Sequence, residues 1–226
     1  MPKTDDRLIV ALDHDELDRS LALVDVLGDL VGFYKVGLTL YTAAGPAAVE
    51  ALRKRAKRVF LDLKLHDIPV QVAGAAAAAA AVGAELLTVH VAGGEAMMQA
   101  AAGAVTGTGM RLLGVTVLTS LAVPEVESVV AAARSARAAG LDGVVAAAGE
   151  AAALRRALGP EPLIVIPGIR LKQAAGDDQA RTGDPAAALA AGASHLVVGR
   201  PITAQTDPRA AAIEILAAMR AEVRCG

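Results

Sequence analysis

The sequence predicts an α/β protein built as a single-domain (β/α)8 barrel of the TIM type, and three observations support this expectation. β-like runs alternate with helix-like stretches eight times along the chain, as expected for parallel strands joined by helical crossovers. The length of 226 residues suits one barrel of this kind. Polar residues recur at the carboxyl ends of the predicted strands, where barrel enzymes carry their catalytic groups.

The predicted strands are short runs rich in apolar residues, separated by helix-like stretches. They cover Leu8–Asp13, Phe33–Gly37, Val59–Lys64, Leu86–Val91, Arg111–Leu118, Gly143–Val145, Leu163–Ile166 and His195–Gly199. The predicted helices cover Asp15–Leu27, Pro46–Lys57, Pro69–Val82, a stretch from Gly93 to Gly103, Pro124–Ala139, Glu150–Leu158, Pro185–Ala191 and Pro208–Val223. No linker or low-complexity tract breaks this series, so we expect residues 1–226 to form one domain. An open doubly wound sheet is the alternative, but no Gly-x-Gly-x-x-Gly follows the first strand, where a dinucleotide-binding fold needs one.

Composition and charge narrow the expected setting and partners. The net charge of −2 gives no basis for binding nucleic acid or an anionic membrane surface. The alanines at 75–81 lie between Gly74 and Gly83, which favours a packing helix over a membrane span. The N-terminal residues lack the apolar stretch of a secretory signal, and the single cysteine, Cys225, cannot form an internal disulfide. We therefore expect a cytoplasmic protein with no nucleic-acid or membrane partner.

The third predicted strand carries the most informative charges of the chain. Side chains alternate between the two faces of a strand, so Asp62 and Lys64 are expected on one face. Leu61, Leu63 and Leu65 then lie on the other face, under covering helices. Asp67 follows the strand, and Pro69 can open a helix. An acid and a base side by side at the end of a buried strand predict catalytic chemistry, although a self-contained ion pair is the structural alternative.

Other strand ends add polar residues to the same expected mouth of the barrel. These residues are Asp13, Lys35, Thr119, Ser120, Arg170, Gly199 and Arg200. The seventh and eighth loops resemble the phosphate site that barrels often build there, with Arg170, Gln179, Gly199 and Arg200 as its predicted parts. The long loop from Arg170 to Pro185, rich in small residues, is predicted to form a lid over the anion.

Metal-binding patterns are lacking from the sequence. No cluster of His, Cys and carboxylate residues has metal-ligand spacing, and the acids of the predicted mouth are accompanied by lysines. We therefore expect no metal. The histidines give weak signals: His90 ends the fourth strand and is interpreted as a hydrogen-bonded core residue, while His14 and His195 are interpreted as incidental.

These residues together resemble the orotidine 5′-phosphate decarboxylase family. The likeness is strongest in Asp62-Leu63-Lys64-Leu65-His66-Asp67-Ile68-Pro69. Further blocks follow in the family's order and span nearly the whole chain: Ala11–Asp13, Lys35–Gly37, Val89–His90, Gly93–Gly94, Met97–Met98, Val115–Ser120, Gly140–Val145, Pro167–Arg170, Asp178–Gln179 and Val198–Pro201.

The resemblance implies a reaction and an assembly. The reaction is the decarboxylation of orotidine 5′-monophosphate to uridine 5′-monophosphate, the last step of pyrimidine synthesis, with no cofactor. The assembly is a homodimer with shared active sites, in which Asp67 and Ile68 reach into the site of the neighbouring subunit.

The resemblance also implies a role for each matching residue. Lys64 would donate a proton to C6, Asp62 would lie beside the departing carboxylate, and Asp67 from the neighbouring subunit would hold Lys64. The other implied contacts are Asp13 and Lys35 at the ribose, Thr119 and Ser120 at the pyrimidine, and Arg170, Gln179, Gly199 and Arg200 at the phosphate. Gln71 stands where the family usually has a threonine, so a longer amide replaces a small hydroxyl at this substrate contact. Ile166 departs from the expected threonine before Pro-Gly-Ile-Arg.

The chemistry of the reaction agrees with these residue types. Loss of CO2 leaves a carbanion that needs a fixed positive charge and then a proton, and a lysine held between two aspartates offers both. Two other functions are compatible with part of this pattern. Related sugar-phosphate decarboxylases and synthases share the Asp-x-Lys-x-x-Asp pattern but use a divalent metal, and a catalytically idle barrel would bind a phosphorylated ligand. Ile68–Pro69 and the Leu118–Ser120 block favour the pyrimidine nucleotide, and the complete set of core charges argues against an idle barrel.

Overall fold

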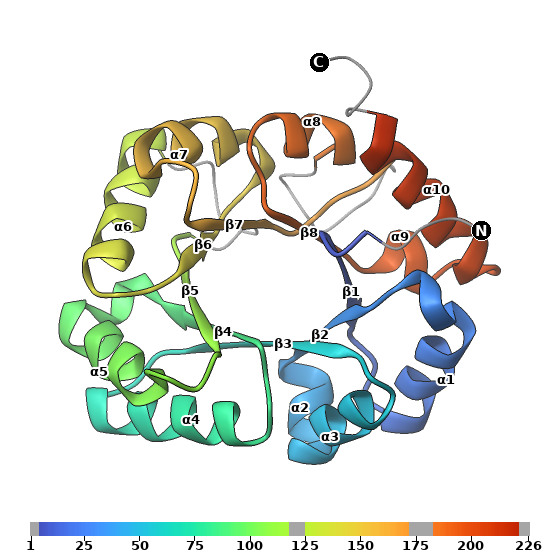
Figure 1. Ribbon diagram of the computed structural model, residues 1–226, viewed down its shortest axis with the longest axis horizontal. Helices are drawn as coiled ribbons and strands as arrows, with labels where there is room; N and C mark the ends of the chain where they lie inside the picture. Colours follow the sequence, from blue (N-terminus) through green and yellow to red (C-terminus); the bar gives the residue numbers. More distant parts are fainter. Residues whose placement is uncertain (1–4, 118–124, 172–182, 222–226) are drawn as a thin grey trace.

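The computed structural model describes residues 5–117, 125–171 and 183–221. Its eight strands are parallel and close into a barrel in chain order, with β1 pairing to both β2 and β8 (Figure 1). The strands are β1 (Leu8–Leu12), β2 (Phe33–Gly37), β3 (Arg58–Leu65), β4 (Leu86–His90), β5 (Arg111–Val115), β6 (Gly143–Val145), β7 (Leu163–Ile166) and β8 (His195–Val198). The predicted (β/α)8 barrel is confirmed. That residues 1–226 form a single domain stays a prediction.

Helices surround the barrel on its outside (Figure 1). They are α1 (Leu17–Leu27), α2 (Leu38–Ala44), α3 (Pro46–Lys54), α4 (Pro69–Ala81), α5 (Glu95–Val105), α6 (Val126–Ala138), α7 (Ala151–Leu158), α8 (Pro185–Ala190), α9 (Arg200–Thr203) and α10 (Pro208–Ala221). Single 3₁₀ turns form at Gly28–Leu30, Val91–Gly93 and Ala148–Glu150. In the described part of the chain, no helix has the length and apolar character that a membrane crossing requires.

Two apolar clusters stabilise the barrel. The larger one lies between strands and helices and uses the outward-facing residues of each strand, such as Leu61 of β3 and Leu87 of β4. The smaller one fills the barrel interior with Ile9, Ala11, Phe33, Phe60, Leu86, Leu113, Val165 and Val197. Each strand contributes to both clusters, β6 through the partly buried Val145 in the interior, because side chains alternate across a strand. The interior cluster is therefore a packed floor beneath the mouth, and any ligand must bind above it.

The alanine-rich helix α4 is a packing helix, as predicted. It lies against α5, and Ala76 and Ala79 are buried while its other face is exposed. Small side chains let two helices approach closely, so α4 and α5 cover this side of the barrel with little side-chain volume.

Several predicted boundaries are wrong, and two helices are missed. Helix α2 begins directly after β2 with Gly37 as its N-cap, so no loop marks it in the sequence. Helix α9 is a single turn, too short to show a helical period. Strand β5 ends at Val115, short of the predicted Leu118, which lies outside the described residues. Beyond Val115, the hydroxyl and the backbone N–H of Thr116 both donate to the carbonyl of Val145, at 3.2 and 3.5 Å.

Candidate active site

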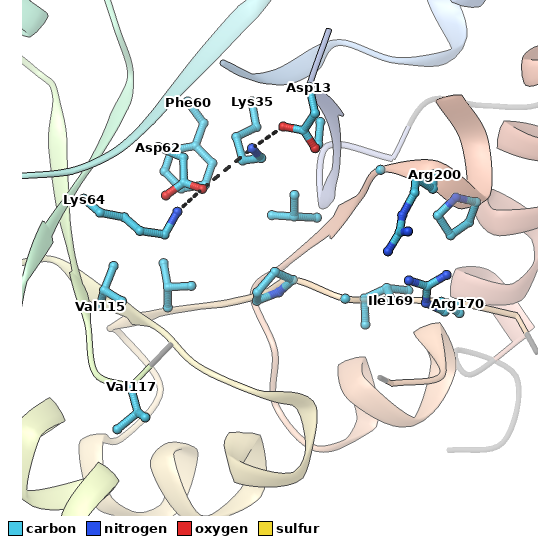
Figure 2. Close-up of a pocket in the computed structure, with 17 residues that line it drawn as sticks. Asp13, Lys35, Phe60, Asp62, Lys64, Val115, Val117, Ile169, Arg170 and Arg200 are labelled. Atoms are coloured by element: carbon cyan, nitrogen blue, oxygen red, sulfur yellow. Dashed lines mark hydrogen bonds and ion pairs between the residues drawn. The ribbon is translucent and has the colours of Figure 1, made fainter. Parts of the chain in front are cut away.

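A cavity of about 270 Å³ opens above the interior cluster, at the carboxyl ends of the strands. Its charged lining consists of Asp13, Lys35, Asp62, Lys64, Arg170 and Arg200. Its apolar lining includes Ala11, Phe60, Val115, Val117, Val145, Ile169 and Val197. Figure 2 shows the aspartates and lysines along one wall and the two arginines at the far side. The cavity therefore has two differently charged ends joined by an apolar floor.

Two lysines and two aspartates form an unbroken row along that wall (Figure 2). The ammonium of Lys64 donates to Oδ2 of Asp62 at 2.8 Å, and Nζ of Lys35 lies 3.7 Å from the same oxygen. Lys35 in turn donates to Oδ1 of Asp13 at 2.9 Å. The inner members, Lys35 and Asp62, have side chains only 12% and 13% exposed, so their attraction is weakly screened by water.

Asp62 is the buried centre of this row. Burial by itself raises the pKa of its carboxyl group, but the charges of Lys35 and Lys64 and hydrogen bonds from Lys64 and Thr88 outweigh burial and lower that pKa. The carboxylate is therefore ionised in the folded protein. Each of its oxygens has its own donor, since Oδ1 accepts from Thr88 at 3.0 Å and Oδ2 accepts from Lys64.

The backbone at Lys64 departs from a regular strand. Its φ of +50° lies in the left-handed region, and the pairing of β3 with β4 shifts between Leu61 and Leu65. Asp62 and Lys64 do line the same cavity, as the alternation argument predicts. Leu61, Leu63 and Leu65 pack on the outer cluster, as predicted, although an irregularity of the backbone interrupts the regular pleat between Leu61 and Leu65.

The arginine end of the cavity is built by the segments after β7 and β8. Arg170 follows Gly168, whose φ of +74° suits glycine, and its backbone N–H donates to the carbonyl of Gly183 at 2.9 Å. Arg200 is the first residue of α9 and directly follows Gly199 at the end of β8. Arg170, Gly199 and Arg200 all line the cavity, as predicted for a phosphate site.

Three of the predicted site residues that the structure describes do not lie at the cavity. Asp67, Ile68 and Gln71 are exposed, and none of them lines it. Oδ1 of Asp67 accepts from the backbone N–H of Ile68 at 2.7 Å. Thr119, Ser120 and Gln179 lie outside the described residues, as does most of the predicted lid between Arg170 and Pro185.

A family comparison assigns the chain. The family model described as Orotidine 5′-phosphate decarboxylase / HUMPS family matches residues 6–215. The chain belongs to this family. The resemblance predicted from the sequence motifs is thus confirmed.

Within the family, the chain is similar to proteins named orotidine 5′-phosphate decarboxylase. Proteins named orotidine 5′-phosphate decarboxylase from Moorella thermoacetica and Anaeromyxobacter sp. (strain K) are 51% and 48% identical, with 94% and 96% of this chain and 91% and 100% of the relatives covered. The crystal structure of orotidine 5′-phosphate decarboxylase from Lactobacillus acidophilus matches with a TM-score of 0.83 at 35% identity, covering 95% of this chain and 99% of that one. The chain therefore matches such decarboxylases in both sequence and fold.

Two residues of this family member contribute to the site without having been singled out from the sequence. Thr88 of β4 is fully buried and bonds both Asp62 and Lys64. Gly37 ends β2 where a Cβ atom would lie 2.8 Å from Nζ of Lys35. A threonine in an apolar strand and a glycine at a strand end are common, so only the hydroxyl-to-carboxylate distance and the close approach of the lysine reveal their importance.

The histidines that follow or end β3 and β4, His66 and His90, are not members of the charged row. The rings of His66 and His90 lie 5.5 Å apart, and burial lowers the pKa of His90, helped by the neighbouring charge of His66. Neither lines the cavity. Across the described residues, no group of three or more His, Cys, Asp or Glu side chains is arranged to hold a metal ion.

Proposed function

We propose that this chain decarboxylates orotidine 5′-monophosphate to uridine 5′-monophosphate, and that Lys64 delivers the proton to C6. The row of Lys64, Asp62, Lys35 and Asp13 in a cavity that also holds Arg170 and Arg200 carries the proposal. A nucleoside monophosphate has a phosphate at one end and a base at the other, which matches the two differently charged ends of the cavity. The relatives that bear the name of this enzyme support the same reaction.

The Lys64 ammonium suits the developing charge of the reaction. Loss of CO2 leaves an electron pair at C6, and a fixed cation close to it lowers the energy of the transition state. The bond to Asp62 and the backbone of β3 hold this cation in place before substrate binds, so little reorganisation is needed as the charge develops. The same ammonium then transfers one proton to C6, which yields uridine 5′-monophosphate and a neutral amine.

Asp62 also acts on the substrate carboxylate in this proposal. It is buried and ionised, so a second carboxylate bound beside it adds repulsion that is relieved when CO2 departs. Lys35 and Asp13 continue the row towards the ribose hydroxyls. Thr119 and Ser120 are proposed to contact the pyrimidine.

The phosphate end supplies binding energy remote from the reacting carbon. Guanidinium groups bind phosphate through paired hydrogen bonds, and glycine allows the backbone to approach closely. We assign this role to Arg170, Gly199 and Arg200, with Gln179 as a fourth contact. Energy from this end can position the pyrimidine for reaction at the other end of the cavity.

A homodimer with shared sites completes the proposal. Asp67 bonds its own loop and does not pair with Lys64 of the same chain, so it is available to pair with Lys64 of a second subunit. Three large apolar side chains near the carboxyl ends of β2 and β3 are exposed: Leu38 at 57%, Ile68 at 59% and Val70 at 70%. A surface of this kind next to a mouth is typical of a subunit interface. Gln71, on the first turn of α4 beside Ile68, is proposed to reach the neighbouring site from the same surface.

The deciding experiment is a metal-free assay of turnover. Purified protein treated with EDTA is mixed with orotidine 5′-monophosphate, and the absorbance change and the product are followed. We expect loss of substrate with uridine 5′-monophosphate as product. Absence of turnover by folded, dimeric protein, or turnover of a sugar phosphate that requires added divalent metal, would contradict the proposal.

A further inference from the structure

Thr88 is buried beside the reacting end of the cavity and bonds two catalytic groups at once. It lies on β4 with no exposed surface. Its Oγ1 accepts a hydrogen bond from the backbone N–H of Lys64 at 2.9 Å and donates one to Oδ1 of Asp62 at 3.0 Å. Thr88 is one of only a few buried polar side chains in the described residues. Burying its hydroxyl costs free energy unless hydrogen bonds compensate for the lost water.

The backbone irregularity of β3 explains why a hydroxyl is needed there. Leu61 pairs with Leu87 and Leu65 pairs with Val89, so β3 uses more residues than β4 over the same span. The backbone N–H of Lys64 falls within this span, and a φ of +50° in a lysine is a strained conformation. Thr88 supplies the acceptor that the interrupted ladder does not, and it thereby stabilises the strained residue.

The direction of the two bonds follows from the chemistry of the groups. An amide N–H can only donate and an ionised carboxylate can only accept, whereas a hydroxyl does both. The hydroxyl proton of Thr88 must therefore point at Asp62. A closed ring results, in which Lys64 donates to Thr88 through its backbone, Thr88 donates to one oxygen of Asp62, and Nζ of Lys64 donates to the other oxygen.

We propose that Thr88 is a positioning residue, which aims the Lys64 ammonium by fixing the backbone of Lys64 and the carboxylate plane of Asp62 together. This inference rests on the proposed roles of Lys64 and Asp62 in decarboxylation. Thr88 acts through these two residues and is not among those that line the cavity. Removing the hydroxyl leaves the lysine charge present but less well aimed, which affects the chemical step more than substrate binding.

Two substitutions separate the hydroxyl from the shape of the side chain. Thr88→Val keeps the branched shape and removes the hydroxyl, and Thr88→Ser keeps the hydroxyl and removes a methyl group. We expect Thr88→Val to lower kcat by roughly 10- to 100-fold, the range for a hydrogen bond to a charged group, with KM changed by less than about 3-fold. Thr88→Ser should retain kcat within about 3-fold. Thr88→Cys, with a weak S–H donor, should fall between them and serves if the valine variant does not fold.

A measurement without substrate distinguishes positioning from a merely structural role. We expect the carboxyl ¹³C signal of Asp62 in the whole protein to titrate at a higher pH in Thr88→Val than in wild type, because a donor to the carboxylate is lost. The Lys64 amide should also exchange faster with solvent. Thr88→Ser should match wild type in both measurements.

The outcomes separate this inference from the proposed function. Equal kcat and equal Asp62 titration in wild type and Thr88→Val would overturn the positioning role, as would equal losses in the valine and serine variants. If both substrate-free measurements respond as expected but wild type does not decarboxylate orotidine 5′-monophosphate, the hydrogen-bond ring stands and the proposed reaction is wrong.

Discussion

At the scale of single residues, Asp62 determines the state of the other charges in the cavity. It is the only member of the row that contacts both lysines, and its pKa is lowered although burial opposes this. An ionised carboxylate between two ammonium groups keeps both cations in defined positions without a metal. The positions of the Lys35 and Lys64 ammonium groups therefore depend on the space that the residues surrounding this row leave for them.

Gly37 provides part of this room, and replacing it tests the importance of the row. In Gly37→Ala the new Cβ would meet Nζ of Lys35 at 2.8 Å and Oδ1 of Asp13 at 3.3 Å, so the Lys35 ammonium must move. The φ of −93° at this position suits alanine, so the backbone is not strained. We expect kcat/KM to fall by about 10-fold or more through misplacement of the charge, with little loss of stability. Steady-state kinetics and urea unfolding measure the two effects.

Gly103→Ala is the matched control for this substitution. Gly103 lies on the exposed face of α5, and an added Cβ meets nothing within 4 Å. Alanine should stabilise this helix by about 0.5–1 kcal/mol and leave kcat/KM unchanged. Equal kinetics in wild type and Gly37→Ala would show that the Lys35 position does not matter for turnover.

The residue types that carry formal charge were the predictable part of the site. Asp13, Lys35, Asp62, Lys64, Arg170 and Arg200 line one cavity because strand ends of a barrel converge, which follows from topology alone. The bond from Thr88 to Asp62 was not predictable, because it crosses between strands at an irregularity in pairing. Register shifts depend on packing of the whole sheet, and period-two reasoning does not include them.

At the scale of elements, secondary structure was predictable where it has a clear period or a clear end. All eight strands were expected in their observed order. Helix α2 was not, because threonine and tyrosine have low helix propensity and the helix is stabilised by packing on the core, where Leu40 is buried and Tyr41 and Ala44 are partly buried. Helix ends that lack a distinct sequence signal were predicted a few residues away from their observed positions. For example, α3 was predicted to end at Lys57 and ends at Lys54.

The N-cap of α8 offers a test of how an element supports the proposed phosphate end of the cavity. Oδ1 of Asp184 accepts from the backbone N–H of Ala187 at 3.0 Å, and the preceding Gly183 accepts from the backbone of Arg170. Asp184→Ala should cost about 1 kcal/mol of stability and lower Tm by about 2–4 °C. Because Arg170 is anchored through Gly183, KM should rise more than kcat falls. Thermal unfolding and initial rates measure both.

Asp184→Asn is the control, since asparagine caps helices as well as aspartate does. It should behave as wild type in Tm and in KM. A rise in KM with the asparagine variant would mean that the charge of Asp184, and not its cap, supports binding at the phosphate end.

At the scale of the whole molecule, the two ends of the barrel carry different charged networks. The carboxyl end holds the row of Lys64, Asp62, Lys35 and Asp13, whereas the amino end is closed by Arg58, Glu85 and Arg111. Arg58 also stacks over the ring of Phe33 at 4.2 Å, and the edge of His195 meets the same ring. The apolar interior cluster separates the two networks. Changes at the amino end should therefore alter stability and leave the chemistry of the mouth unchanged.

His195 makes the amino end sensitive to pH. Burial lowers its pKa to about 4, assisted by the charges of Arg58 and Arg111, and its Nδ1 has no hydrogen-bond partner among the described residues. The unfolded chain binds a proton near pH 6.5 and the folded chain only near pH 4, so this group destabilises the fold as pH falls through that interval. From pH 7 to pH 5 the expected loss is about 2 kcal/mol.

His195→Leu should remove this loss, because leucine cannot bind a proton. Urea unfolding of both proteins at pH 7 and pH 5 measures the difference. The lowered pKa values of His14 and His90 act in the same pH interval but are common to both proteins, so they cancel in the difference, and those of Asp62 and Glu85 act mainly below about pH 5. An identical pH dependence in the variant and in wild type would contradict the assignment to His195.

Subunit mixing tests the proposed shared site, which belongs to the assembly and not to one chain. Lys64→Ala removes the proposed proton donor of its own site, and Asp67→Ala removes the residue that one subunit is proposed to lend to the other, so each homodimer should be nearly inactive. In a mixed dimer, one site pairs an intact Lys64 with an intact Asp67 from the other subunit, while the second site lacks both. We expect mixing to restore activity to about one quarter of wild type, because random exchange makes half of the dimers mixed and each has one complete site.

The two variants carry different affinity tags, so that sequential purification proves exchange. Proven mixed dimers without activity would show that Asp67 serves its own chain, and the exposed apolar surface at Leu38, Ile68 and Val70 would then need another partner.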